Sequence, residues 1–333
     1  MNYAILSDVH ANETALRAVL TDAQDFGADR VFCLGDVLGY GPDPVSALEL
    51  VHDRAHVCLL GNHDAAVCGA MPVDDFTPVA AAAVATHTSR LSSKAMAWLR
   101  TLPSVCEGPG FACAHGDFSD PDAFNYILDP EDAMPSWEAR DEPLLFVGHT
   151  HQPGIYVLGA SGEPHRLEPM DFVVEDGKRY IVNVGSVGYP RSGACRSFYC
   201  IYDDSTRTVY FRSLPFDLEG YRRKMNGQGL VSEIIEYEPD GKPFKTVKIE
   251  YDNYGDEVNR CVYKAGNQMI EYTYTEYAQD GRVRKVIYED KLHHIKEFHY
   301  FFDYDSNKNW QTEVCAVDGQ ILYIKQRKFT YYE

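Results

Sequence analysis

Five short motifs built from Asp, His, Asn and Gly each follow directly after an apolar, β-rich run in the first half of the chain. The motifs are Asp8-Val9-His10, Gly35-Asp36, Gly61-Asn62-His63-Asp64, His115-Gly116 and Gly148-His149-Thr150-His151. Apolar runs of this kind are typical of strands, so each motif lies at the C-terminal end of a predicted strand. Ligands bind at that edge of open α/β sheets. We therefore expect all five motifs to face one pocket.

Further apolar runs predict the other elements of the same domain. Strands are expected over 3–8, 31–35, 57–61, 111–116, 144–149, 155–159, 180–185, 197–203 and 208–213. Helices are expected over 13–26, with Asn12 as the N-cap, over 43–53 and over 78–101. Strands that alternate with helices and then follow one another predict an α/β layered domain whose sheets become partly antiparallel.

The composition of the chain changes abruptly near residue 226. Residues 1–226 contain three lysines and are rich in Ala, Pro and Arg, whereas residues 227–333 contain three alanines and are rich in Lys and Tyr. The segment Asn226-Gly227-Gln228-Gly229 reads as a short flexible link between them. We therefore predict two domains, 1–226 and 227–333. The sequence leaves open whether their fusion is natural or engineered.

In residues 227–333 apolar and aromatic residues mostly alternate with polar ones. Turn signals separate the runs at 240–241, 253–255, 266–267, 280–281, 306–307 and 318–319. This spacing is typical of hairpins and predicts an antiparallel all-β meander. The segments 302–310 and 327–332 resemble the Tyr-Asp (YD, Rhs-like) repeats of bacterial surface and secreted proteins. We expect this module to make contacts with other proteins.

Charge and cysteine usage limit the classes of function and compartment. The formal net charge is −19, which argues against binding to a nucleic acid backbone. No apolar run approaches the roughly 18 residues that a membrane span needs, and no secretory signal is visible, so we expect a cytoplasmic protein without membrane contact. The nine cysteines are scattered and form no CxxC pair, which indicates buried free thiols.

The motifs supply seven oxygen and nitrogen donors and no sulfur: Asp8, His10, Asp36, Asn62, His115, His149 and His151. A mixture of imidazole and carboxylate suits Mn, Fe, Co or Zn better than Mg or Ca. Seven donors exceed the needs of one tetrahedral ion and suit two ions that share a bridging carboxylate. Two ions about 3.5–4 Å apart activate a water for in-line displacement at phosphorus.

The ordered set D-x-H, G-D, G-N-H-D, H-G and G-H-T-H resembles the calcineurin-like metallophosphoesterase superfamily. Residues 35–44 and 183–188, with Pro190 and Arg191, are similar to a small bacterial and archaeal phosphodiesterase-type branch. The resemblance spans residues 1 to about 220. It implies a four-layer α/β/β/α sandwich with two divalent metal ions between the sheets, manganese being favoured and Fe, Zn, Co or Ni compatible. Family members commonly end in a short helix, whereas residues 215–224 are expected to lead directly into the tail.

The resemblance also implies a role for each matching residue. The first ion would be held by Asp8, His10 and His151, the second by Asn62, His115 and His149, with Asp36 bridging the two. His63 would bind neither ion and would protonate the leaving oxygen. His52, His56, His87 and His165 match no motif and are interpreted as structural or surface residues.

The resulting hypothesis is a phosphodiesterase that hydrolyses a small phosphorylated, nucleotide-like substrate through a metal-bridging hydroxide. One alternative is a catalytically weak scaffold for protein contacts. A second is a protein phosphatase, although the loop after Asp36 lacks the Arg of that branch. The natural substrate is not readable from the sequence. The aromatic residues of the 117–140 segment either stack on a base or form core under a long loop: Phe118, Phe124, Tyr126 and Trp137.

Overall fold

The computed structural model describes residues 1–74, 76–191, 196–227, 233–237, 243–251, 257–264, 268–277, 283–292, 294–304, 310–317 and 320–326. The chain divides into two compact units, Met1–Gln228 and Gly229–Glu333. The division falls two residues after the predicted boundary at 226. The predicted link at 226–229 begins inside a helix, and its last two residues lie outside the described part of the chain.

The first unit contains two six-stranded mixed sheets. One sheet has the order β3-β2-β1-β11-β12-β9. Its strands are β1 (Asn2–Leu6), β2 (Arg30–Cys33), β3 (Val57–Cys58), β9 (Phe172–Val173), β11 (Ser197–Asp203) and β12 (Thr208–Leu214). Strands β1, β2 and β3 are parallel, whereas β11 and β12 are antiparallel to their neighbours.

The second sheet has the order β4-β5-β6-β10-β7-β8. Its strands are β4 (Val105–Gly108), β5 (Phe111–Ala114), β6 (Leu144–Val147), β7 (Gly154–Leu158), β8 (Pro164–Leu167) and β10 (Arg179–Asn183). Strands β5, β6 and β10 are parallel. The carboxyl ends of β5 and β6 therefore lie at one edge of this sheet, as those of β1, β2 and β3 do in the first.

Helices separate and follow these strands along the chain. They are α1 (Glu13–Phe26), α2 (Pro44–Arg54), α3 (Asn62–Val67), α4 (Pro78–Arg90), α5 (Ser93–Leu99), the 3₁₀ helix η1 (Pro130–Ala133), α6 (Met134–Ala139) and α7 (Leu218–Gly227). Asn12 caps α1 as predicted, accepting a hydrogen bond from the Ala15 amide.

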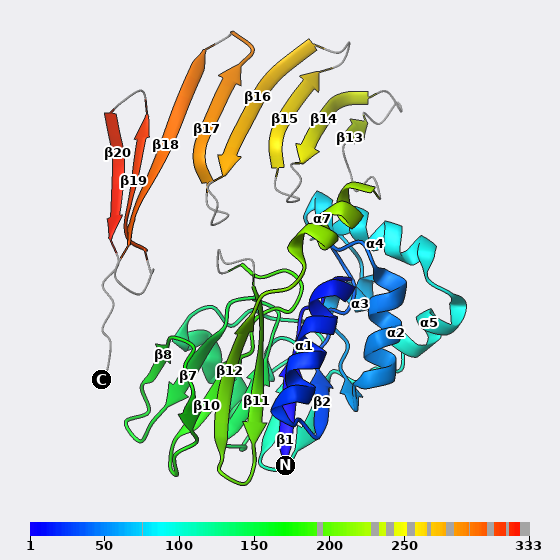
Figure 1. Cartoon of the computed structure of the whole chain (residues 1–333), viewed down its shortest axis with the longest axis vertical. Helices are drawn as coiled ribbons and strands as arrows, with labels where there is room; N and C mark the ends of the chain where they lie inside the picture. Colours follow the sequence, from blue (N-terminus) through cyan, green and yellow to red (C-terminus); the bar gives the residue numbers. More distant parts are fainter. Residues whose placement is uncertain are drawn as a thin grey trace. The chain divides into compact units, whose positions relative to one another are not determined.

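Three buried cores separate four layers. In the first core, Leu16 of α1 and residues of α2 pack against Ala4 of β1, and Figure 1 shows both helices beside β1 and β2. In the second core, Ile5 of β1 meets Phe146 of β6, so the two sheets face each other. In the third, Trp137 of α6 covers the outer face of the second sheet. The α/β/β/α sandwich predicted from the sequence is confirmed.

The expected helix over 78–101 is wrong in its length, because the chain breaks at Leu91 and Ser92. Leu91 adopts an extended conformation, and the Ser92 side chain accepts a hydrogen bond from the Ala95 amide to begin α5. A serine that caps a new helix competes with continuation of the old one. Strands β4, β8 and β9 and helices η1 and α6 were not expected from the apolar pattern.

The expectation that residues 215–224 lead directly into the tail is also wrong, because α7 forms there. Tyr221 of α7 is buried, and the helix packs against α1. The Lys224 ammonium lies 3.2 Å from the Glu13 carboxylate and 2.7 Å from that of Asp43. The first unit therefore closes with a helix.

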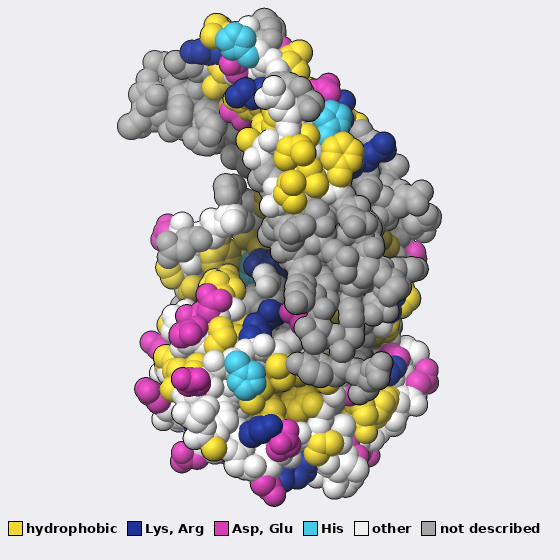
Figure 2. All heavy atoms as spheres, turned by 90° about the vertical axis from the view of Figure 1, so that its left-hand side faces the viewer, with side chains coloured by type: hydrophobic (Ala, Val, Ile, Leu, Met, Phe, Trp, Pro, Cys, Tyr) yellow, Lys and Arg dark blue, Asp and Glu magenta, His cyan; other side chains and the backbone are white. Residues whose placement is uncertain are grey.

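The second unit is one antiparallel sheet in which each strand pairs with the next, from β13 to β20. Its strands are β13 (Glu233–Tyr237), β14 (Pro243–Tyr251), β15 (Glu257–Lys264), β16 (Gln268–Tyr277), β17 (Val283–Asp290), β18 (Ile295–Tyr304), β19 (Trp310–Val317) and β20 (Gln320–Gln326). The predicted all-β meander is confirmed, although all six predicted turns lie outside the described residues. Hydrophobic side chains gather on its visible face (Figure 2). Phe301 and Ile324 are among the exposed hydrophobic side chains of this unit.

Within the described part of the chain, none of the helices combines the length and apolar character needed to cross a membrane. Cysteines 33, 58, 68, 106, 113, 200 and 315 are free, and all of these except Cys106 are buried.

We expect a chain that ends at Gln228 to fold without the second unit, because every described residue of the three cores lies between Tyr3 and Phe216. It should show mixed α/β circular dichroism and one cooperative unfolding transition. A chain that ends at Phe216 should be less stable by about 2 kcal/mol, because it lacks the buried Tyr221 of α7. An unfolded 1–228 fragment would contradict this division.

Candidate metal centre

The carboxyl ends of five parallel strands bring all eight predicted site residues together. Asp8 and His10 follow β1, Asp36 follows β2, Asn62 and His63 open α3 after β3, His115 follows β5, and His149 and His151 follow β6. The site thus lies where the edges of the two sheets meet. All eight lie in the first unit.

The ligand atoms form two groups that share one carboxylate. One group contains Asp8, His10, Asp36 and His151, and the other contains Asp36, His115 and His149. Within each group the donor atoms lie within 4.8 Å of one another, and every residue is buried. Asn62 lies beside the second group, since its side-chain oxygen is 3.3 Å from His115 Nε2.

Backbone carbonyl groups orient three of the imidazole rings. His10 Nδ1 donates to the Leu38 carbonyl at 2.9 Å, and His115 Nδ1 donates to that of Leu34 at 2.9 Å. His151 Nδ1 donates to the Tyr189 carbonyl at 2.6 Å. Because Nδ1 carries a proton in each case, Nε2 is the ring nitrogen left to face a metal ion.

Two buried polar atoms of the two ligand groups have no hydrogen-bond partner, namely Asp8 Oδ1 and His149 Nε2. A buried polar atom without a partner costs about 1–3 kcal/mol, so such atoms are rare in native proteins. Both atoms belong to residues of the two ligand groups. The donor set and these atoms fit divalent metal ions.

The protonation states also suit metal binding. Burial lowers the pKa of His149 to about 3. Burial favours the protonated form of Asp36, but the charges of His115 and His63 outweigh it and hold the pKa well below its usual value. Burial likewise opposes protonation of His115, yet Asp36 raises the pKa of that ring to about 9. The His115 ring would therefore have to give up a proton if a divalent ion were bound beside Asp36.

The backbone is strained at the ligands. Positive φ angles occur at Asp8 (56°), His10 (46°), Asp36 (51°), His149 (65°) and His151 (60°). Residues with side chains disfavour this left-handed region, and such strain concentrates at functional sites. The rest of the fold holds these five residues in conformations that they would not adopt alone.

Comparison with known proteins identifies the family of this chain. The model of the calcineurin-like phosphoesterase superfamily domain matches residues 1–206. The chain belongs to this superfamily. The matched part of the phosphoesterase contains every predicted ligand and ends before the second unit.

Individual relatives agree with this assignment. An uncharacterized protein of Methanocaldococcus jannaschii is 32% identical over 220 residues, 65% of this chain and 88% of its own length. A metallophosphoesterase structure from Sphaerobacter thermophilus is 36% identical with a TM-score of 0.61, covering 69% of this chain and 95% of that one. A hypothetical protein from Pyrococcus horikoshii shares the fold, at 18% identity and a TM-score of 0.55, over 69% of this chain and 94% of that one.

His63 of the phosphoesterase lies beside the ligands but in neither group. Its ring packs edge-on against His10 with centroids 4.9 Å apart and against Phe76 at 4.8 Å. Its backbone amide donates to Asp36 Oδ1 at 2.9 Å. The buried Nδ1 atom of this ring has no hydrogen-bond partner. Packing rather than hydrogen bonding therefore sets its orientation.

Asp64 is a buried part of the site for which no role was predicted. Its carboxylate accepts hydrogen bonds from the amides of Val37 at 3.1 Å and Leu38 at 2.9 Å, directly after Asp36. Burial and the charge of Asp36 raise its pKa to about 7. Its position next to His63 in the third motif was the available signal.

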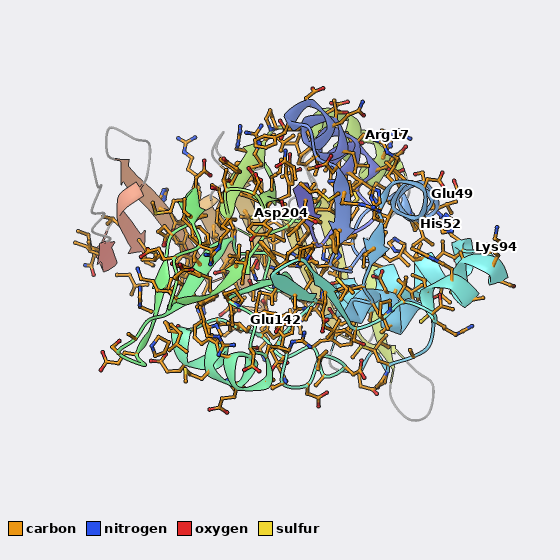
Figure 3. All side chains as sticks on the ribbon, turned by 90° about the horizontal axis from the view of Figure 1, so that it is seen from below. Arg17, Glu49, His52, Lys94, Glu142 and Asp204 are labelled. Atoms are coloured by element: carbon orange, nitrogen blue, oxygen red, sulfur yellow. The ribbon has the colours of Figure 1, made fainter. Side chains whose placement is uncertain are left out.

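His87 of α4 also supports the site, although it matches no motif. Its buried ring accepts a hydrogen bond from the Gly39 amide at 3.1 Å and donates one to the Gly41 carbonyl at 2.9 Å. Gly39 has a φ of 95°, and a Cβ atom there would lie 2.3 Å from His63 Nδ1. His87 therefore fixes the loop against which His63 packs. By contrast, His52 is exposed on the outer side of α2 (Figure 3).

We expect His87 to make the phosphoesterase less stable in mild acid. Burial lowers its pKa to about 4, against 6.5 when unfolded, so protonation favours the unfolded state. This effect is absent above the unfolded pKa and grows as the pH falls towards the folded pKa. Between pH 7 and pH 5 the wild type should lose about 2 kcal/mol more stability than His87→Gln, whose amide can serve both backbone groups.

Denaturant unfolding of both proteins at the two pH values measures this difference. An equal loss in the two proteins would show that His87 is not held neutral by the fold.

Proposed function

We propose that the first unit is a dinuclear-metal-dependent phosphodiesterase. The observation that carries this proposal is the sharing of Asp36 by two groups of buried ligands. A single ion needs only one such group. A carboxylate common to both is what a bridged pair of ions requires.

The proposed first ion is held by Asp8, His10 and His151, and the second by Asn62, His115 and His149, with Asp36 between them. Divalent ions at such a centre, when bound, neutralise phosphoryl oxygens and activate water for attack at phosphorus. The mixture of imidazole and carboxylate, without sulfur, supports manganese and is compatible with Fe, Zn, Co or Ni.

We propose His63 as the proton donor to the leaving oxygen. The position of His63 supports this proposal. Its ring contacts His10 of one group, and its backbone amide donates a hydrogen bond to the shared Asp36. It lies outside both ligand groups, so its ring remains available to the substrate. A positioned imidazole contributes about 10²–10⁴-fold to a proton transfer.

A phosphodiester fits this site better than a phosphoprotein. The loop after Asp36 contains Leu38, Gly39, Tyr40 and Gly41 and lacks the arginine of the protein phosphatase branch. Tyr40 instead packs over His63, with ring centroids 4.9 Å apart. A diester carries one negative charge fewer than a monoester at neutral pH, so it needs less cationic support.

The proposed activity predicts preferential hydrolysis of bis-p-nitrophenyl phosphate over p-nitrophenyl phosphate when Mn²⁺ is added to metal-stripped protein. Asp36→Asn should remove activity and the metal content of both sites, because Asp36 belongs to both groups. His52→Ala is the matched control, since His52 is exposed and outside the site. No hydrolysis of either ester would favour the scaffold function, and a preference for the monoester would favour the phosphatase.

The role of His63 is tested by His63→Ala. Metal content should stay unchanged while hydrolysis of esters with poor leaving groups falls by roughly 10²–10⁴-fold. The loss should be smaller for p-nitrophenyl esters, because a good leaving group needs no proton. Loss of metal from this variant, or an equal loss for both kinds of ester, would refute the assignment.

A further inference from the structure

Two tyrosine platforms adjoin the ligand groups and remain partly open to solvent. Tyr126 stacks on His149 with centroids 3.9 Å apart and planes 22° apart, yet 49% of its surface is exposed. Tyr189 stacks on Tyr40 at 4.3 Å and 10°, and 40% of Tyr189 is exposed. The first platform contacts the second ligand group, and the other contacts His10 of the first group.

The fold holds the Tyr126 platform in place. The neighbouring residues Phe124 and Ile127 are buried, and the Tyr156 hydroxyl donates to the Ile127 carbonyl at 2.9 Å. Earlier in the same loop, the buried Asp117 accepts a hydrogen bond from the Asn125 side chain at 3.3 Å. The exposed ring therefore lies between two buried residues, in a segment that hydrogen bonds hold to the rest of the unit.

Hydrogen bonds also hold the second platform in place. His87 bonds to the backbone on both sides of Tyr40, through Gly39 and Gly41. The Tyr189 carbonyl accepts the hydrogen bond of His151 Nδ1, which places this residue next to the first ligand group. Both platforms thus adjoin the place where a phosphoryl group would bind.

Metal binding alone does not account for these rings. His10 and His151 already have carbonyl partners, and neither tyrosine hydroxyl belongs to a ligand group. Since His149 covers one face of Tyr126, its exposed half includes the opposite face. Exposed aromatic faces beside a phosphate site are stacking platforms for nucleobases, because every base presents a flat π-face.

We propose that Tyr126 and the Tyr40–Tyr189 pair form a subsite for the nucleobase of a nucleotide-type phosphodiester. The proposal rests on the proposed phosphodiesterase function and names its substrate class. A base stacked on the face of Tyr126 opposite His149 would be separated from His149 by the Tyr126 ring. This separation suits a base joined through its sugar to a phosphoryl group held at the ligand groups.

The test compares two diesters that release the same p-nitrophenolate: the p-nitrophenyl ester of thymidine monophosphate and methyl p-nitrophenyl phosphate. The measured quantity is the ratio of their kcat/KM values with Mn²⁺ bound. A stacked base should favour the nucleoside ester by about 5- to 100-fold. Tyr126→Ala should reduce this ratio, with the change mainly in KM, whereas Tyr126→Phe should retain it.

Leu128→Ala is the matched control, since Leu128 is exposed on the same loop and belongs to neither platform. It should keep the wild-type ratio. A wild-type ratio near one, or an unchanged ratio in Tyr126→Ala, overturns the subsite. In that case the tyrosines only shield the ligand histidines from water.

A binding measurement separates the subsite from the activity. Calorimetry of the full chain with adenosine monophosphate and with ribose phosphate compares ligands that differ only in the base. Tighter binding of the nucleotide, lost in Tyr126→Ala and kept in Tyr126→Phe, supports the subsite even if neither diester is hydrolysed. That combined result would reject the phosphodiesterase and retain the subsite, whereas equal affinities would reject the subsite.

Discussion

The buried carboxylate of Asp36 is the interaction on which the site depends. His115 Nε2 lies 3.4 Å from its Oδ2 atom and His10 Nε2 lies 3.7 Å away, while the His63 amide donates to Oδ1. A buried charge is costly unless it is paired and hydrogen-bonded. The neighbouring histidines provide this pairing and hydrogen bonding for the Asp36 carboxylate. Because both ligand groups include Asp36, a substitution of this residue changes both groups at once.

The elements around Asp36 hold its neighbours in a narrow range of positions. Strand β2 ends two residues before Gly35, and Asp64 ties the amides of Val37 and Leu38 directly after it. A Cβ atom at Gly61 would lie 2.2 Å from the Asp36 amide nitrogen, so the two loops pass in direct contact. The strained φ angles of the ligands persist because these contacts outweigh the local preference of the backbone.

Much of the fold and the grouping of the candidate site residues could be predicted, because both follow from local sequence patterns. Apolar runs that end in Asp, His or Asn indicate strand ends, and parallel strands bring those ends to one edge. Residues that support the site from elsewhere in the chain follow no such local pattern. His87 stands 48 positions from Gly39 and acts through backbone groups. Tyr126 was noted as an aromatic, but only tertiary packing shows that it stacks on His149 while Phe118 and Trp137 are buried.

Anomalous X-ray diffraction can establish whether two metal ions share Asp36, as we propose. Crystals of the full chain grown with Mn²⁺ would be measured at the manganese absorption edge. We expect two anomalous peaks about 3.5–4 Å apart, one on each side of the Asp36 carboxylate. A single peak, or two peaks of which one lies away from Asp36, would contradict it.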